Sequence, residues 1–139
     1  LFNIYLVLLI LIVLLKFDGT LNFSYVKAIR QSLLESSELN INLILFDTIK
    51  PYLNMISHQF AFKNIVGNIL AFVPLGFFMS ILFFRKNIIK TFFGGVLVIL
   101  FIESIQLVTK IGFFDVDDIL LNSIGILIGY IISLVFLKI

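Results

Sequence analysis

The residues of this sequence that could do chemistry are carboxylates and amides set within long apolar stretches. They form three pairs, each on one face of an expected helix: Asn64 with Asn68, Glu103 with Gln106, and Asp118 with Asn122. Polar side chains are costly inside a membrane-spanning helix, so they mark ligand or ion sites there by default. We therefore predict that these six residues, together with Asp115, bind a ligand or substrate.

Glu103 is the strongest candidate for a role that depends on charge. A carboxylate deep in a bilayer must be paired, hydrated or protonated. In an enzyme it would be the catalytic acid or base. Asp115 and Asp118 could then hold a divalent cation against a phosphate, and their oxygen ligands suit Mg²⁺ or Ca²⁺ rather than zinc.

The same polar residues also have purely structural interpretations. Asn68 and Asn122 could form hydrogen bonds between packed helices. Asp115, Asp117 and Asp118 could cap the helix that begins at them, because carboxylates are favoured at the positive end of the helix dipole. A G-x-x-x-G pattern, formed by Gly125 and Gly129, allows a close helix contact and possible self-association of the chain.

Composition indicates the class of protein that must position these residues. Of the 139 residues, 61% are hydrophobic and 13% charged, whereas soluble domains are roughly half apolar and a quarter charged. A soluble domain of this length could not bury so much apolar surface. The chain is therefore expected to be an all-α integral membrane protein. It has no cysteine, which excludes thiolate chemistry, and a net charge of +2 gives no reason to expect nucleic acid as a partner.

Apolar runs predict four transmembrane helices in a single membrane domain that covers residues 1–139. They are expected at about 1–16, 64–84, 91–110 and 118–137. The first run, Leu1–Leu15, would cover ~22 Å of a hydrocarbon core ~30 Å thick, so we expect a first span trimmed at its start. A signal peptide is the alternative, although no small-residue cleavage site follows the run.

Loop charge predicts the orientation of these spans. Segment 85–90 carries three cations and no anion, whereas segment 110–118 carries one cation and three carboxylates. Lysine and arginine in short loops mark the cytoplasmic side. Segments 16–63 and 110–118 are then external, and both termini are cytoplasmic. The polar pairs all fall in the outer halves of their helices, which predicts a polar cavity that opens outward.

The long external segment is expected to contain two short amphipathic pieces that lie in the outer interface. Tyr25, Ile29 and Leu33 recur at helical spacing, and Asn42–Tyr52 is apolar yet too short to cross the membrane. Pro51 is expected to disfavour helix at Lys50. The alternative is a partly disordered loop.

Four ordered elements between residues 40 and 137 resemble the VanZ-like family of bacterial membrane proteins. They are Asn42-Leu43-Ile44-Leu45-Phe46, the run from Asn64 to Phe77, Glu103-Ser104-Ile105-Gln106, and Asp115-Val116-Asp117-Asp118 followed by Asn122, Gly125, Gly129 and Tyr130. Leu45 stands where the family's N-L-x-P-F element has proline, and the nearest basic residue before the aspartates is Lys110. The family pattern includes Asn68, Glu103, Gln106, Asp118 and Asn122.

The resemblance implies a protein of the bacterial cytoplasmic membrane, in a family whose named member is associated with resistance to teicoplanin. The leading hypothesis is a protein that binds a lipid, a lipid-linked precursor or a lipidated glycopeptide antibiotic at an outer-leaflet polar cavity. It would contribute to antibiotic resistance or envelope homeostasis. The alternatives are an enzyme that acts on a lipid-linked or phosphorylated envelope substrate, and a subunit whose polar residues only align its helices with a partner.

Overall fold

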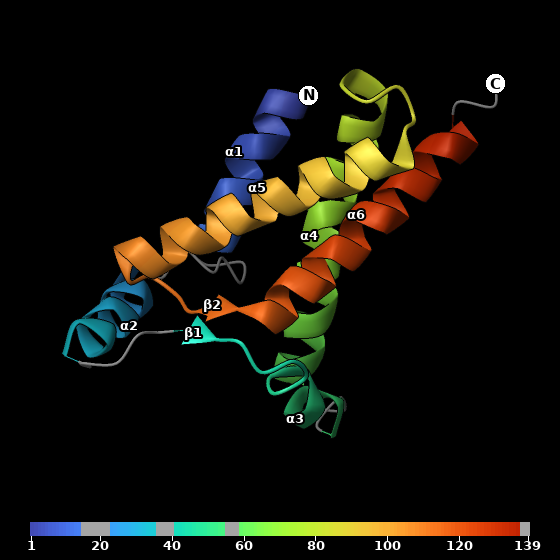
Figure 1. Ribbon diagram of the computed structural model, residues 1–139. Coiled ribbons are helices and arrows are strands. Elements are labelled where there is room, and N and C mark those ends of the chain that lie inside the picture. Colours follow the sequence, from blue (N-terminus) through green and yellow to red (C-terminus); the bar gives the residue numbers. More distant parts are fainter. Residues whose placement is uncertain (15–22, 36–40, 55–58, 137–139) are drawn as a thin grey trace. The chain divides into compact units, whose positions relative to one another are not determined.

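The computed structural model describes residues 1–14, 23–35, 41–54 and 59–136 of the chain (Figure 1). In chain order its elements are α1 (Phe2–Leu14), α2 (Phe23–Glu35), β1 (Ile41–Asn42), α3 (Ile49–Asn54), α4 (Gln59–Leu82), α5 (Ile88–Thr109), β2 (Phe114–Asp115) and α6 (Val116–Phe136). The chain divides into two compact units. The first contains Leu1–Leu43 and Leu100–Asp115, and the second contains Ile44–Ile99 and Val116–Ile139.

Three helices in the described part are long and apolar enough to span a membrane. They are Asn64–Leu82 within α4, Ile88–Thr109 and Val116–Phe136, each about twenty residues long. These helices match the three later spans predicted from the sequence. Helix α1 is apolar but has only 13 residues, so the first of the four expected spans stays a prediction.

Helix α5 begins three residues earlier than the apolar pattern predicts, at Ile88. Asn87 explains this start, because its side-chain oxygen accepts a hydrogen bond from the backbone N–H of Lys90, 3.0 Å away. Such a bond satisfies one of the N–H groups that the first turn of a helix leaves without a partner. The polar Lys90 is therefore helical, although the apolar run starts after it.

In the second unit, α4 and α6 pack closely through glycines on both helices (Figure 1). A Cβ atom added at Gly125 or Gly129 would meet the backbone carbonyls of Ile69 and Val73 on α4. Closer to the carboxyl ends of the two helices, the hydroxyls of Ser80 and Ser133 lie 2.7 Å apart in a buried hydrogen bond. The G-x-x-x-G pattern thus serves a contact within the chain, and self-association through these glycines stays a prediction.

The first unit contains a short β pair that the expected all-α fold did not include. Strand β1 pairs with β2 in parallel, with Ile41 opposite Phe114 and Asn42 opposite Asp115. Strands of two residues are too short to show the alternation of apolar and polar residues by which a strand is recognised in a sequence. The fold is therefore mostly helical, with one small parallel bridge.

The expected external segment contains two helices, α2 and α3. Helix α2 covers the region of the predicted amphipathic spacing, although the side chains of Tyr25 and Ile29 lie outside the described residues. The prediction that Pro51 would keep Lys50 out of a helix is wrong, because Lys50 belongs to α3. Proline is tolerated in a first helical turn, where its missing N–H would have had no helical partner.

Candidate functional site

The candidate site of the second unit starts at the first turn of α6, which carries Asp117 and Asp118. Carboxylates are favoured there because the unpaired N–H groups of a helix start give it a positive partial charge. Successive residues of a helix point about 100° apart, so the two aspartates face different neighbours. Their roles in the structure differ accordingly.

Asp117 is 0% exposed. It accepts three backbone hydrogen bonds from the turn that precedes α3 and from the first residue of α3. Its carboxylate oxygens bind the N–H groups of Phe46 at 2.6 Å, Thr48 at 2.9 Å and Ile49 at 3.1 Å. The sequence suggested that Asp117 caps its own helix, whereas in the structure it caps α3. This role was missed because the bonded segment lies 68 to 71 residues earlier in the chain.

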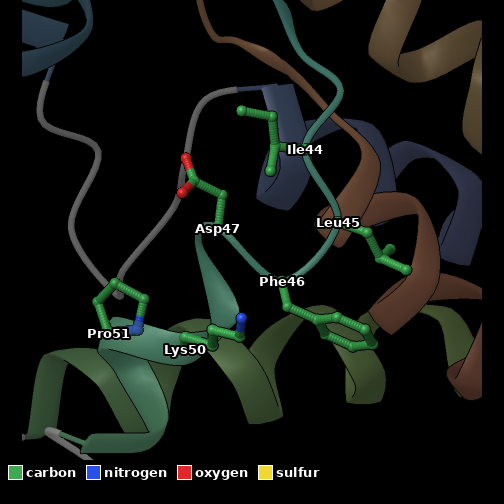
Figure 2. Close-up of a pocket in the computed structure, with 6 residues that line it drawn as sticks. All are labelled: Ile44, Leu45, Phe46, Asp47, Lys50 and Pro51. Carbon is green, nitrogen blue, oxygen red and sulfur yellow. The ribbon is translucent and has the colours of Figure 1, made fainter.

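The turn that Asp117 holds contains a residue in an uncommon backbone conformation. Phe46 has a φ of 67°, a left-handed conformation that costs an L-residue about 1–2 kcal/mol. Figure 2 shows the side chains of this turn, which surround an open depression of about 220 Å³. Its lining consists of Ile44, Leu45, Phe46, Asp47, Lys50 and Pro51. Asp117 thus stabilises a strained turn with an exposed apolar tip.

Asp118 bonds to a second predicted site residue, Asn68 on α4. The Asn68 amide nitrogen donates to one carboxylate oxygen of Asp118 at 2.7 Å. The stripes predicted on these two helices therefore meet, and Asn68 orients the carboxylate. Asn64, one turn earlier on α4, is half-buried on the same helix.

Asn122 lies one helical turn after Asp118 on the same stripe of α6. Its side chain is 2% exposed, and its buried Oδ1 atom has no hydrogen-bond partner among the described residues. Leaving a buried acceptor unpaired costs about 1–3 kcal/mol. Together with Asp118, this amide oxygen makes the stripe rich in acceptors. Such a stripe suits a ligand that donates hydrogen bonds, such as an ammonium or hydroxyl group.

The remaining predicted site residues belong to the first unit. Glu103 and Gln106 lie on one face of α5 and are 1% and 5% exposed. The Gln106 amide nitrogen donates to the backbone oxygen of Val13 at 3.0 Å, which ties α5 to the end of α1. Asp115, in β2, accepts a 3.4 Å hydrogen bond from the Asn42 side chain.

Two predictions join residues from different units and stay predictions. One is that Glu103 and Asp118 face a shared cavity, and the other is that Asp115 and Asp118 share a divalent cation. Across the described ranges, no three or more histidine, cysteine, aspartate or glutamate side chains are grouped so that they could hold a metal ion.

Comparison with known proteins agrees with the resemblance noted in the sequence. The model of the VanZ/LLP1 family matches residues 2–137, nearly the whole chain. No curated protein and no solved structure matches the chain. The family match includes both units and every candidate residue named above.

Proposed function

Because the chain belongs to the VanZ/LLP1 family and has three helices suited to spanning a membrane, we propose that it binds an amphiphile of the cell envelope. The family and the apolar helices fit a multi-pass membrane protein linked to antibiotic resistance. The proposed ligand is a lipid, a lipid-linked precursor or a lipidated glycopeptide antibiotic. These share an apolar tail and a polar head with amine or hydroxyl donors.

The observation that carries this proposal is the buried, unpartnered oxygen of Asn122 beside the Asn68–Asp118 pair. A helix pair that needed only to pack would be more stable with an apolar residue at position 122, because the unpaired oxygen costs free energy. A donor group of a ligand would satisfy that oxygen and also reach an acceptor on Asp118. The apolar helix surfaces would then remain available to the ligand's tail.

Each residue has a distinct part in the proposed binding. Asp118 contributes charge and accepts a donor of the ligand, while Asn68 orients its carboxylate. Asn122 accepts a second hydrogen bond at the next turn of the helix. Asp117 does not touch the ligand but holds the neighbouring turn in position.

The proposal places this site toward the outer leaflet, with α1 as a fourth span and both termini in the cytoplasm. Its support is the charge of the loops, since segment 85–90 carries three cations and no anion. The chain has no cysteine, so single cysteines can report orientation. In intact cells, a membrane-impermeant thiol reagent should label a cysteine at position 112 but not at 87. The reverse pattern would place the site on the cytoplasmic side.

Binding is tested by identifying the lipids that copurify with the full chain by native mass spectrometry. A bound amphiphile should be retained by the wild type and by Asp47→Asn, which removes an exposed carboxylate. Asp118→Asn and Asn122→Leu should each reduce its occupancy at equal protein yield. Equal occupancy in all four proteins would overturn the proposed site.

An enzymatic function is the second candidate, and one observation favours it. Glu103 is 1% exposed on α5, a burial that is unusual for a carboxyl and typical of groups with tuned reactivity. If it is the acid or base, Glu103→Gln should abolish turnover of a phosphorylated or lipid-linked envelope substrate without loss of folding. Retained function in this variant would exclude acid–base catalysis by Glu103.

A further inference from the structure

The turn between α4 and α5 is held in an uncommon conformation at the far end of the second unit. Arg85 and Lys86 have φ values of 47° and 62°, which L-residues rarely adopt. The Lys86 N–H donates to the Ser80 carbonyl at 2.8 Å, and the Tyr130 hydroxyl donates to the Lys86 carbonyl at 3.0 Å. Two helices thus fix a turn that presents its side chains outward. Residues in strained backbone conformations cluster at ligand-binding sites in proteins.

This turn and the start of α5 concentrate positive charge. Arg85, Lys86 and Lys90 are all exposed, and they surround the amino-terminal end of α5, which is itself partly positive. An acidic residue at this position would be stabilising, yet the sequence has none between Asp47 and Glu103. The charges of the turn and the helix end therefore repel one another.

Among the described residues of the second unit, the carboxylates lie too far from Arg85 and Lys90 to neutralise them. Asp118 precedes Tyr130, the partner of Lys86, by twelve residues of α6, or ~18 Å. Asp47 lies in the turn that Asp117 holds at that same distant start of α6. This separation exceeds the ~8 Å Debye length at physiological salt.

The cations line a hollow together with aromatic rings. An open cavity of about 530 Å³ is bordered by Phe83, Phe84, Arg85, Asn87 and Lys90. Phe83 is 57% exposed. Because the turn joins the end of one membrane-spanning helix to the start of the next, it lies at a membrane surface. A ligand here would meet cations on the water side and phenyl rings on the hydrocarbon side.

We infer that this turn binds an anionic phospholipid, with the headgroup phosphate between Arg85 and Lys90 and the acyl region against the two phenylalanines. The phosphate supplies negative charge beside Arg85 and Lys90, because the described carboxylates of the second unit lie at the start of α6. Basic pockets between membrane helices recognise anionic headgroups by the same physics. This site is independent of the proposed ligand site, which lies at the opposite end of α6.

The test uses the full chain in nanodiscs of phosphatidylcholine, to which phosphatidylglycerol is added. Native mass spectrometry should show preferential retention of phosphatidylglycerol by the wild type. Arg85→Gln with Lys90→Gln should lower this preference about 30-fold, since each cation near an anionic headgroup contributes about fivefold. The charge-preserving exchange Arg85→Lys with Lys90→Arg should retain most of it.

A matched control removes two exposed cations elsewhere, with Lys27→Gln and Arg30→Gln on α2. This control should leave the preference unchanged. An equal loss in the control would mean that only net charge matters and would overturn the site. Equal retention of both lipids by the wild type would also overturn it. If inorganic phosphate at matched concentration displaces the lipid, the site recognises phosphate alone, and the assignment to a lipid is wrong.

Discussion

The two ends of α6 each hold a strained turn, but they do so with opposite chemistry. At its start, the buried Asp117 carboxylate accepts three backbone N–H groups around Phe46. Near its end, the Tyr130 hydroxyl donates one hydrogen bond to the Lys86 carbonyl, at an exposed position. Hydrogen bonds to charged groups are worth about 1.5–3 kcal/mol each, whereas neutral ones are worth about 0.5–1.5 kcal/mol.

The difference suggests that the two ends of α6 have different functions. The start of α6 is built to keep the backbone rigid beside Asp118 and Asn122, where a polar ligand would need aligned acceptors. The other end keeps its turn by weaker contacts and presents exposed cations, for which approximate placement near a membrane surface is enough. Electrostatic attraction tolerates such freedom, whereas directional hydrogen bonds do not.

The strongest test of this comparison is Asp117→Ala. The substitution leaves three backbone N–H groups without their acceptor, so we expect the free energy of unfolding to fall by about 4 kcal/mol. Thermal unfolding of the chain in nanodiscs would measure this loss. Asp47→Asn changes an exposed carboxylate in the same turn and should stay within about 0.5 kcal/mol of the wild type. Similar losses in the two variants would mean that Asp117 does not hold the turn.

Between the two ends, the glycines of α6 keep it close to α4, so Gly129→Ala should affect both ends together. The added Cβ would meet the backbone carbonyl of Val73, which cannot move aside as a flexible side chain could. We expect a loss of about 3 kcal/mol by the same unfolding measurement. Gly67→Ala on α4 is the matched control because its Cβ would enter open space. It should be neutral or slightly stabilising.

The two asparagines at the start of α6 and beside it on α4 are expected to have different roles, Asn68 in stability and Asn122 in ligand binding. Asn68→Leu removes the donor of Asp118 and should destabilise the chain by about 1.5 kcal/mol. Asn122→Leu removes an unpartnered oxygen and should leave stability unchanged or raised by about 1 kcal/mol, while ligand occupancy falls. Parallel unfolding and native mass spectrometry of both variants would show this contrast. A large loss of stability in Asn122→Leu would assign that residue to packing.

The sequence predicted the features that depend on long, local patterns. Twenty-residue apolar runs gave α4, α5 and α6, because the bilayer sets the length of a span. The stripe of Asp118, Asn122, Gly125 and Gly129 predicted one face of α6, although not that α4 would cover it. The cost of polar groups in apolar helices singled out Asn68 and Asp118, although it did not predict that they would bond to each other.

Features that depend on contacts between distant segments could not be predicted in the same way. Asp115, Asp117 and Asp118 are chemically identical, and only folding assigns Asn42 to the first, a backbone turn to the second and Asn68 to the third. The strands β1 and β2 are too short to leave a pattern. Lys50 was misjudged because the general effect of proline on its predecessor was applied at a helix start, where α3 tolerates it.

The smallest expected effect is that of Tyr130→Phe, which removes one exposed hydrogen bond and keeps the ring. Global stability should fall by no more than about 1 kcal/mol, because the lost bond is neutral and open to water. The local effect should be clearer. Hydrogen exchange should accelerate at the Lys86 N–H, which bonds to Ser80, as the turn opens more often. The N–H groups of Thr48 and Ile49 serve as an internal control, because Asp117 holds them at the other end of α6. Acceleration at both ends would show that the two turns open together, and the comparison between a rigid start and an adjustable end of α6 would then be wrong.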